Sequence, residues 1–330
     1  MKAVRITAFG PPSVLRLQEV HDPRPAEHEI LVRVHATALN RADLLQRLGK
    51  YPPPEGTRAD IPGLEFAGEV EAAGEAVSRF RVGDRVMGLL PGEGYAEKVV
   101  TPEEMALPIP TNLSFVEAAA IPEVFLTAYD ALVRQLRLKQ GERLLVHAVG
   151  SGVGIAALQI ARHLGATTFG TAGTDEKLRK ARDLGLNVGV NYTKADFAEV
   201  VRRETHDQGV DAILDLVGAS YWDKNIACLA QRGRMILIGL LGGAEAKVNL
   251  ARIMWKRLRI FGSVMRGRSL TEKADLTRRF ETELLPAFAS GDLKPVVDRV
   301  FPLHDAAAAH AYMEANRNFG KIVLQVAGGA

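Results

Sequence analysis

The chain from about residue 123 onwards alternates short apolar segments with segments of helical period. The apolar segments are rich in β-branched residues, and the sequence between them, such as VGIAALQIARHLG, repeats apolar residues every three or four positions. The apolar segments are LLVHA, ATTFGTA, NVGVNY, GVDAILDLVG and GRMILIGLLG. Because strands without polar positions must be covered on both faces, this alternation predicts a parallel sheet flanked by helices.

A glycine-rich loop, HAVGSGVG at 147–154, joins the first of these strands to the first helix. Phosphates bind at such helix starts, because free N–H groups and the helix dipole point at them. Glycine also lets a pyrophosphate approach the backbone closely. The spacing departs from G-x-G-x-x-G, since Val149 stands where the first glycine belongs. The context predicts dinucleotide binding, and the alternative is a tight turn kept for packing.

The residues after the second and third strands indicate which dinucleotide binds. Gly173 and Thr174 stand where an NAD-binding fold places an acid for the ribose hydroxyl, and Asp175 follows in the first helical turn. Lys177 could reach a 2′-phosphate, and Tyr192 could cover it. Together they favour NADP(H). The alternative is that Lys177 is a solvated helix residue and Tyr192 a half-buried aromatic at a strand end.

Residues 1 to about 120 carry short apolar stretches bounded by Gly, Pro or charged residues. They include ILVRVHATAL, LEFAGEVEAAG, GDRVMGLL and GYAEKVVTP. Strands at this spacing without intervening helices predict a barrel-like β-domain. One helix, NRADLLQRLG, is expected to place Leu44, Leu45 and Leu48 on one face and to end at the prolines of YPPPEG. The tail is expected to add two helices and a last strand, KIVLQVA.

Composition and charge limit the class of protein. The chain is 47% hydrophobic and 25% charged, as in soluble globular proteins, and it has no uncharged apolar run of about 18 residues. The N-terminus lacks the apolar core of a signal peptide, so we expect a cytoplasmic location without membrane partners. The single cysteine, Cys228, excludes a disulfide framework and a multi-cysteine metal site. The basic pieces WKRLR and MRGRS are interpreted as solvated surface rather than a nucleic-acid site.

Several segments together resemble one protein family over the whole chain. The segments are ALNRADLLQRLGKYPPP, IPGLEFAGEVEAAG, VGDRV, AAAIPEVFLTAYDAL, HAVGSGVG and NRNFGKIVL. They resemble the zinc-free, zeta-crystallin-like quinone oxidoreductases of the medium-chain dehydrogenase/reductase superfamily, in the branch of the tumour-suppressor-inducible enzyme. The resemblance implies an α/β protein with a GroES-like β-barrel catalytic domain over 1–122. It also implies a Rossmann NADP-binding domain over 123–265 and a segment over 266–330 that returns to the catalytic domain.

Departures from the zinc-dependent relatives argue against a metal. Asn40 stands where those enzymes have a cysteine and Leu64 where they have a histidine, and no cysteine-rich lobe is present. Zinc requires such thiolate and imidazole ligands, so alcohol oxidation is not expected. His304 and His310 fall on different faces of a helix and are interpreted as surface histidines. Glu65 is interpreted as a core acid of the barrel.

The resemblance also implies the residues of a cofactor site in a cleft between the two domains. Expected near the nicotinamide are Asn40, Tyr51 and Thr127, with Leu240, Leu241 and Ser263 on its far side. Expected at the phosphates are Ser151, Gly152 and Val153, then Gly173, Lys177 and Tyr192, with Asn318 closing over the cofactor. Simpler explanations exist: Asn40 could cap its helix and Thr127 could bond its own backbone. Leu240 and Leu241 could be plain apolar residues at a strand end.

Without a metal, the acceptor must already be electrophilic, as quinones and α,β-unsaturated carbonyls are. We expect NADPH to reduce a quinone near Tyr51, whose hydroxyl could donate a hydrogen bond to it; otherwise Tyr51 is a turn aromatic stacked on prolines. The alternatives are a reductase of enoyl thioesters or alkenones, and an NADPH-binding structural or RNA-binding protein. The resemblance further implies a homodimer that pairs sheets edge to edge, with GRMILIGLL and LRIFGSV as edge strands.

Overall fold

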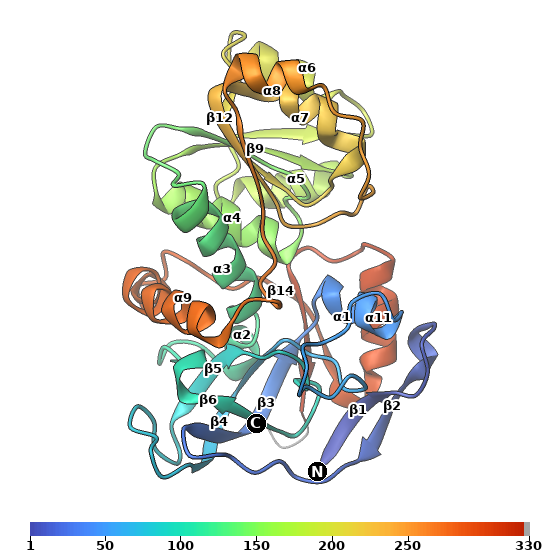
Figure 1. Ribbon diagram of the computed structural model, residues 1–330, viewed down its shortest axis with the longest axis vertical. Coiled ribbons are helices and arrows are strands. Elements are labelled where there is room, and N and C mark those ends of the chain that lie inside the picture. The colour runs from blue at the N-terminus through green and yellow to red at the C-terminus, as the bar shows by residue number, and fades with distance from the viewer. Residues whose placement is uncertain (327–330) are drawn as a thin grey trace. The chain divides into compact units, whose positions relative to one another are not determined.

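The computed structural model describes residues 1–326 and divides the chain into two compact units (Figure 1). One, the terminal unit, combines Met1–Leu126 with Met265–Ala330, and the other, the central unit, is Thr127–Val264. The division lies close to the boundaries at 122/123 and 265/266 that the sequence suggests. The functions assigned to those three segments remain predictions.

The central unit is built on a six-stranded sheet in the order β10-β9-β8-β11-β12-β13. All neighbouring strands in it are parallel, which confirms the predicted parallel sheet. Its strands are β8 (Arg143–Val146), β9 (Thr167–Ala172), β10 (Val188–Asn191), β11 (Val210–Asp215), β12 (Leu229–Leu237) and β13 (Arg259–Gly262). The order reverses between β8 and β11, and such switch points are where doubly wound folds bind ligands.

Helices connect these strands as the sequence predicts. They are α3 (Pro122–Tyr129), α4 (Gly152–His163), α5 (Asp175–Arg182), α6 (Phe197–Glu204), α7 (Trp222–Cys228) and α8 (Leu250–Lys256). The central helix α4 contacts β8 and β9, and α5 contacts β9 and β10. Nearly every side chain of α4 after its first turn is buried, since its sequence there is almost wholly apolar. None of the helices in residues 1–326 has the length and hydropathy needed to cross a bilayer.

The outer strands of the central sheet are β10 and β13. The segment LRIFGSV, which contains β13, is therefore an edge strand, as expected. The segment GRMILIGLL, which contains most of β12, was expected at an edge and lies instead between β11 and β13. Periodicity alone could not separate the two, because both strands are short and apolar.

The terminal unit is the predicted GroES-like β-domain, built on a seven-stranded sheet in the order β14-β15-β3-β4-β5-β7, with β6 paired to β3. Its strands are β3 (Glu29–Ala38), β4 (Glu65–Ala73), β5 (Arg85–Leu89), β6 (Lys98–Pro102), β7 (Ala106–Pro108), β14 (Val297–Pro302) and β15 (Lys321–Gln325), beside a hairpin of β1 (Lys2–Ile6) and β2 (Leu15–Glu19). The helices are α1 (Arg41–Arg47), α2 (Phe115–Ala118), α9 (Leu270–Glu283), α10 (Leu285–Ala289) and α11 (Ala306–Glu314). Register shifts in the β3–β4 pairing bend these strands over the core.

Helix α1 does not bury the leucine face that the sequence suggests. Leu44 is buried, but Leu45 is 36% exposed and Leu48 is 39% exposed. The inner face instead carries polar side chains, including Gln46 and Arg47. Each has partners that replace water: the Arg47 guanidinium, for example, donates to the Gly10 carbonyl oxygen at 2.9 Å. Tertiary hydrogen bonds have thus overridden the hydrophobic pattern.

His310 is a second correction, because it is buried rather than on the surface. Its Nδ1 lies 3.2 Å from an Arg47 nitrogen, and its Nε2 lies 3.2 Å from the Tyr95 hydroxyl. Burial, reinforced by the charge of Arg47, lowers the pKa of His310 to about 3. His304 is exposed, as expected, with 65% of its side chain accessible.

Two basic segments interpreted as solvated surface also contain structural cations. Arg266 of MRGRS is only 5% exposed. Lys256 of WKRLR donates to the carbonyl oxygens of Ile226, Ala227 and Leu229 at 2.6 to 3.0 Å. These contacts stabilise the fold and argue further against a nucleic-acid surface.

Burial of His310 is expected to lower the free energy of unfolding as the pH becomes acidic. Its folded pKa lies below the ordinary value of 6.5, so the unfolded chain binds the extra proton and gains stability as the pH falls below about 6.5. Between pH 7.5 and pH 5.0 we expect the wild type to lose about 2 kcal/mol more of its unfolding free energy than His310→Gln loses. Urea unfolding at both pH values measures the difference. The matched control, His304→Gln, should keep the wild-type pH dependence, and an identical slope in His310→Gln would contradict the prediction.

Candidate functional site

The predicted residues of the central unit gather at one edge of its sheet. Since all six strands run parallel, their carboxyl ends meet there. Ser151 follows β8, Gly173 follows β9 and Tyr192 follows β10. Leu240 lies beyond the end of β12, and Ser263 directly follows β13. Sequence order alone placed these residues on the edge where doubly wound folds bind their ligands.

The glycine loop is closely packed at the start of α4. Ser151 is the N-cap residue, and its Oγ accepts a hydrogen bond from the Gly154 N–H at 3.0 Å. A Cβ at Gly154 would lie 2.4 Å from the Ala148 carbonyl oxygen, so only glycine fits. Gly152 and Val153 form the first turn, which contains no acidic residue. The backbone N–H groups of a helix start lack intrahelical partners, so this turn can bind an anion.

A buried network of hydrogen bonds lies at the ends of the strands around this loop. The His147 ring contacts the Thr171 hydroxyl at 3.0 Å and the Asn225 side-chain oxygen at 2.7 Å. Asn225 donates to Asp215, which also accepts the Gly218 N–H at 3.1 Å. Desolvation lowers the pKa of His147 to about 4, so the ring is neutral. The sequence pattern did not predict this network, which joins β8, β9 and β11 through α7.

Gly173 and Tyr192 are in direct contact. A Cβ at Gly173 would lie 2.6 Å from the Tyr192 hydroxyl oxygen, so the glycine makes room for the phenol. Tyr192 is 51% exposed, which leaves one side of its ring open. Lys177, in the first turn of α5, donates its backbone N–H to the capping Thr174 at 3.3 Å. Gly173 and Tyr192 are thus brought together, and the role of Lys177 at a 2′-phosphate stays a prediction.

An ion pair that the sequence did not reveal lies beside them. Lys194 Nζ contacts the Asp175 carboxylate at 2.5 Å. The Asn191 amide donates to the other oxygen of Asp175 at 2.7 Å. The spacing of 19 residues between Lys194 and Asp175 is not a helical one, so only the folded chain shows the contact.

The residues expected on the far side of the nicotinamide follow β12 and β13. Leu240 and Leu241 are 55% and 57% exposed, so they are not packed into the end of the sheet core. Ser263 is hydrogen-bonded: its hydroxyl lies 3.3 Å from both Asp130 and Gln135. Two apolar side chains are therefore available to contact a ring.

The side-chain hydroxyl of Thr127 is buried without a hydrogen bond within residues 1–326. Its Oγ1 is buried, and no hydrogen-bond partner exists for it among the described residues. The expectation that it bonds its own backbone is therefore wrong. A buried hydroxyl without a partner costs free energy, so its presence in α3 favours an external partner such as an amide of a bound ligand.

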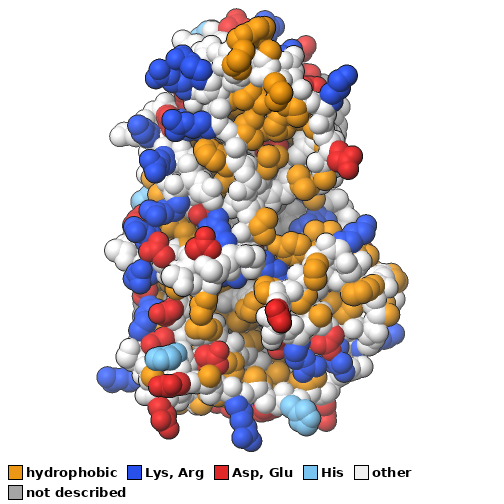
Figure 2. All heavy atoms as spheres, viewed as in Figure 1, with side chains coloured by type: hydrophobic (Ala, Val, Ile, Leu, Met, Phe, Trp, Pro, Cys, Tyr) orange, Lys and Arg blue, Asp and Glu red, His pale blue; other side chains and the backbone are white. Residues whose placement is uncertain are grey.

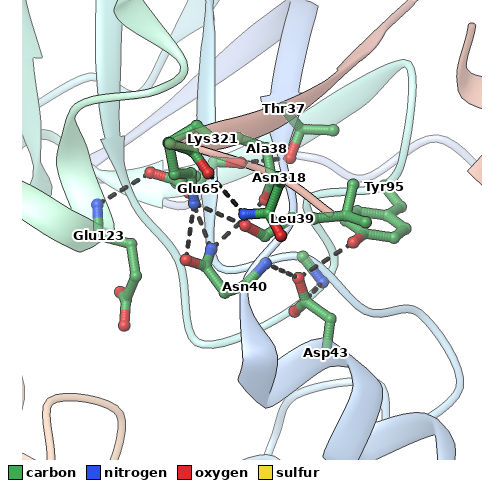
Figure 3. A network of polar contacts seen from close by, with 12 residues as sticks. Thr37, Ala38, Leu39, Asn40, Asp43, Glu65, Tyr95, Glu123, Asn318 and Lys321 are labelled. Carbon is green, nitrogen blue, oxygen red and sulfur yellow. Dashed lines mark hydrogen bonds and ion pairs between the residues drawn. The ribbon is translucent and has the colours of Figure 1, made fainter. Parts of the chain in front are cut away.

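Asn40 lies at the centre of a polar cluster in the terminal unit (Figure 3). It occupies the N-cap position of α1, and its backbone N–H donates to Asp43 at 2.8 Å. Its side chain does more. The amide nitrogen donates to Glu65 at 2.8 Å, and the amide oxygen accepts from Lys321 at 2.7 Å. Both amide ends are thus fixed in orientation.

Glu65 and Lys321 form a buried ion pair at 2.7 Å. The Lys321 ammonium also donates to the Leu39 carbonyl oxygen at 2.6 Å, and Glu65 accepts the Glu123 backbone N–H at 2.9 Å. Glu65 is fully buried, which confirms its interpretation as a core acid. Lys321 was not singled out in the sequence, because a lysine at the start of a strand ordinarily lies in solvent.

Tyr51 lies against Arg266. The guanidinium carbon is 5.2 Å from the centre of the phenol ring, and the guanidinium donates to the Tyr51 carbonyl oxygen at 3.1 Å. Arg266 also donates to Gln46 at 2.7 Å, which holds the turn that carries Tyr51. Desolvation, reinforced by Glu123, raises the pKa of Tyr51, so its hydroxyl stays protonated near neutral pH. Burial and the charge of Glu65 raise the pKa of Glu123 to about 8.

Asn318 belongs to the terminal unit with Asn40 and Tyr51. Its side-chain amide donates to the Gly320 carbonyl oxygen at 2.8 Å, and the residue is partly buried. Its predicted closure over a cofactor stays a prediction. The structure thus places three of the predicted residues in the terminal unit and the others in the central unit.

Comparison with known proteins gives consistent matches along the chain. Residues 26–111 match the family described as "Alcohol dehydrogenase GroES-like domain", and residues 152–281 match the family described as "Zinc-binding dehydrogenase". The quinone oxidoreductase of Rattus norvegicus is 32% identical, and the alignment covers 98% of this chain and 97% of that protein. The quinone oxidoreductase of Pseudomonas aeruginosa is 34% identical, with 98% and 99% covered.

Solved structures extend the comparison. The NADPH complex of Escherichia coli quinone oxidoreductase has a TM-score of 0.89 and 32% identity, covering 98% of this chain and all of that one. A structure described as an NAD-dependent alcohol dehydrogenase has a TM-score of 0.89 and 38% identity, covering 99% and 100%. The CurK enoyl reductase has a TM-score of 0.88 and 30% identity, covering 98% and 99%.

The Glu65–Lys321 pair predicts a stability pattern. Lys321→Met leaves a buried carboxylate without its cation, so we expect a loss of about 3 to 5 kcal/mol in the free energy of unfolding. The double variant Glu65→Gln with Lys321→Met removes both charges and should recover most of that loss. Lys98→Met, which breaks partly exposed pairs with Asp22 and Glu71 in the same unit, should cost less than about 1 kcal/mol. Urea unfolding measures all three, and a double variant no more stable than Lys321→Met would contradict the argument.

Proposed function

We propose, from the premise that this chain belongs to the quinone oxidoreductase family of the medium-chain dehydrogenases/reductases, that it is an NADPH-dependent quinone reductase. The premise follows from relatives 32–34% identical over almost the whole chain. The observation that most favours NADPH is the group at the ends of β9 and β10. There a glycine, a tyrosine and a lysine stand where an NAD-binding site would present a free acid.

The residues present fit the cofactor. The first turn of α4, with Ser151, Gly152 and Val153, would bind the pyrophosphate, since Gly154 lets the helix start pack tightly against the loop. The ring of Tyr192 and the ammonium of Lys177 would hold the adenosine 2′-phosphate. When bound, NADPH supplies a hydride from C4 of its nicotinamide. The partnerless hydroxyl of Thr127 is suited to a nicotinamide amide.

The chain's own residues would orient the acceptor and exclude water. Tyr51 keeps its proton, because its pKa is raised, and it is held by Arg266, so it can donate to an acceptor oxygen. Asn40 presents an amide whose orientation is fixed by Lys321 and Glu65. Such fixed donors lower a barrier mainly through positioning.

We propose that the reaction needs no zinc, although one matched family is described as zinc-binding. No group of three or more His, Cys, Asp or Glu residues suited to a metal occurs within residues 1–326. Asn40 and Leu64 are not zinc ligands, and Glu65, whose carboxylate accepts from the Asn40 amide, already pairs with the Lys321 ammonium. A second cation at this carboxylate would be repelled. An acceptor without metal activation must itself be electrophilic, as a quinone is.

A second candidate is the reduction of α,β-unsaturated carbonyl compounds, favoured by the likeness to the CurK enoyl reductase. Both acceptor classes would accept a hydride and then a proton from water, and both would be held by a hydrogen bond to the carbonyl oxygen. The third possibility, an NADPH-binding structural or RNA-binding role, is less favoured, since Arg266 and Lys256 of the two basic segments bond within the fold.

We further propose a cytoplasmic homodimer that pairs β13 with the β13 of a second copy. This edge strand directly follows α8, whose Leu250, Met254 and Trp255 are 72%, 66% and 71% exposed. Figure 2 shows hydrophobic side chains gathered over the same unit. An apolar edge of this kind is a liability unless it is covered. The mass of the particle in solution tests the pairing.

The function predicts a cofactor preference and an acceptor preference. Fluorescence titration should give a dissociation constant for NADPH about 10- to 100-fold below that for NADH, the range expected for charge-assisted contacts to a phosphate. NADPH oxidation should then be faster with a quinone than with an enoyl thioester, and elemental analysis should find no stoichiometric zinc. Tighter NADH binding, or the absence of hydride transfer to both acceptor classes, would contradict the proposal.

Tyr51→Phe removes the proposed hydrogen-bond donor alone. We expect kcat with a quinone to fall about 10-fold, which corresponds to one neutral hydrogen bond, while the dissociation constant of NADPH stays unchanged. Steady-state kinetics measure the effect. Tyr312→Phe is the matched control, because it removes a hydroxyl of α11 that donates to Asp298 of β14 in the same unit, and it should leave kcat unchanged. Unchanged turnover in Tyr51→Phe would exclude its role.

A further inference from the structure

We propose that Lys194 is a specificity-determining residue that selects NADPH by neutralising Asp175. This inference rests on the proposed function, because it concerns how the same dinucleotide site discriminates between two cofactors. It adds Lys194, Asp175 and Asn191 to the site. None of the three binds the phosphate in this proposal; they set the charge that the phosphate meets.

The contacts around Asp175 occupy both of its oxygens. Lys194 Nζ lies 2.5 Å from Oδ2, and the Asn191 Nδ2 lies 2.7 Å from Oδ1. The orientation of the Asn191 amide is set by Thr193, whose N–H and hydroxyl donate to the Asn191 oxygen at 3.1 and 2.7 Å. The amide nitrogen therefore has to face Asp175. Asn191 is only 9% exposed, so this arrangement is held from within the fold.

The position of Asp175 makes its charge matter. It lies two residues beyond Gly173 and two before Lys177, the residues proposed to meet the adenosine phosphate. A free carboxylate here would accept a ribose 2′-hydroxyl and repel a 2′-phosphate, which is the preference of an NAD site. With its oxygens taken by Lys194 and Asn191, the carboxylate favours neither. The Lys194 hydrogen bond, followed by that of Asn191, lowers the pKa of Asp175, so the carboxylate is ionised and the pairing is ionic.

The ion pair has little to offer the stability of the fold. The Lys194 side chain is 66% exposed and that of Asp175 is 63% exposed. Exposed pairs of this kind contribute about 0 to 1 kcal/mol to folding. The pair is expected to affect the binding of a nearby phosphate dianion more than it affects folding. Without Lys194, the uncompensated carboxylate would repel the phosphate directly.

One turn carries both Tyr192 and Lys194. It begins at Asn191, the last residue of β10, and the Lys194 N–H closes it on the Asn191 carbonyl oxygen at 3.0 Å. Tyr192 contacts Gly173, and Lys194 contacts Asp175, so the two side chains of one turn address two neighbouring residues after β9. The turn therefore couples the cover of the phosphate to the removal of the competing charge.

A double-mutant cycle tests the inference. Dissociation constants of NADPH and NADH are measured by fluorescence titration at one fixed salt concentration for the wild type, Lys194→Met, Asp175→Asn and the double variant. We expect Lys194→Met to weaken NADPH about 5- to 10-fold and to leave NADH unchanged or tighter. In the Asp175→Asn background, the same change should weaken NADPH by less than about 2-fold.

The control is Lys180→Met, which removes a lysine of α5 that pairs with Glu176 at 2.8 Å, and it should change neither constant by more than about 2-fold. An equal loss for NADPH and NADH in Lys194→Met would overturn the inference. So would an undiminished loss in the Asp175→Asn background, since Lys194 would then contact the phosphate directly. A wild type that prefers NADH would instead contradict the proposed function, so the two failures are distinguishable.

Discussion

The terminal unit is organised around one buried charge, the carboxylate of Glu65. A buried carboxylate is tolerated only when its charge is balanced and its oxygens are hydrogen-bonded. Lys321 supplies the charge from β15, Asn40 supplies an amide from the start of α1, and the Glu123 N–H supplies a donor from the start of α3. Three segments far apart in the sequence therefore converge on one side chain of β4. The same contacts fix Asn40 and, through like charge, favour the protonated form of the Glu123 side chain.

The central unit holds a second buried polar network. Neutral His147 contacts the Asn225 side-chain oxygen, Asn225 donates to the Asp215 carboxylate, and that carboxylate also accepts the Val217 backbone N–H. This hydrogen-bond network links the ends of the strands, and the loops beyond them present the side chains of the candidate site. A rigid support is what a dinucleotide needs, because its phosphates are recognised by backbone groups that must not move. The glycines then decide how closely a ligand can approach, as at Gly154.

Periodicity was enough to predict the parallel sheet, its helices and the loop before α4, because each depends on a local pattern. It failed where a side chain finds its partner far along the chain. The inner face of α1 is polar because Arg47 meets Gly10 and His310, and no local pattern encodes those meetings. The ion pairs of Lys321 and Lys194 were not predicted for the same reason, because the partner of each lysine lies on another segment. The sequence thus predicted where a candidate site lies, while the charge balance around it could only be seen in the fold.

Two structures of equal overall likeness are described with different nicotinamide cofactors. The structure described as an NAD-dependent alcohol dehydrogenase shares 38% identity with this chain, more than the NADPH-bound Escherichia coli enzyme does, and both have a TM-score of 0.89. A backbone of this fold is therefore compatible with either cofactor. Discrimination between NADPH and NADH must then come from a few side chains after β9 and β10. There the carboxylate of Asp175, free or paired, determines whether the local charge opposes a phosphate. A fold can keep its scaffold and exchange its cofactor there, because an exposed ion pair can be gained or lost at almost no cost in stability.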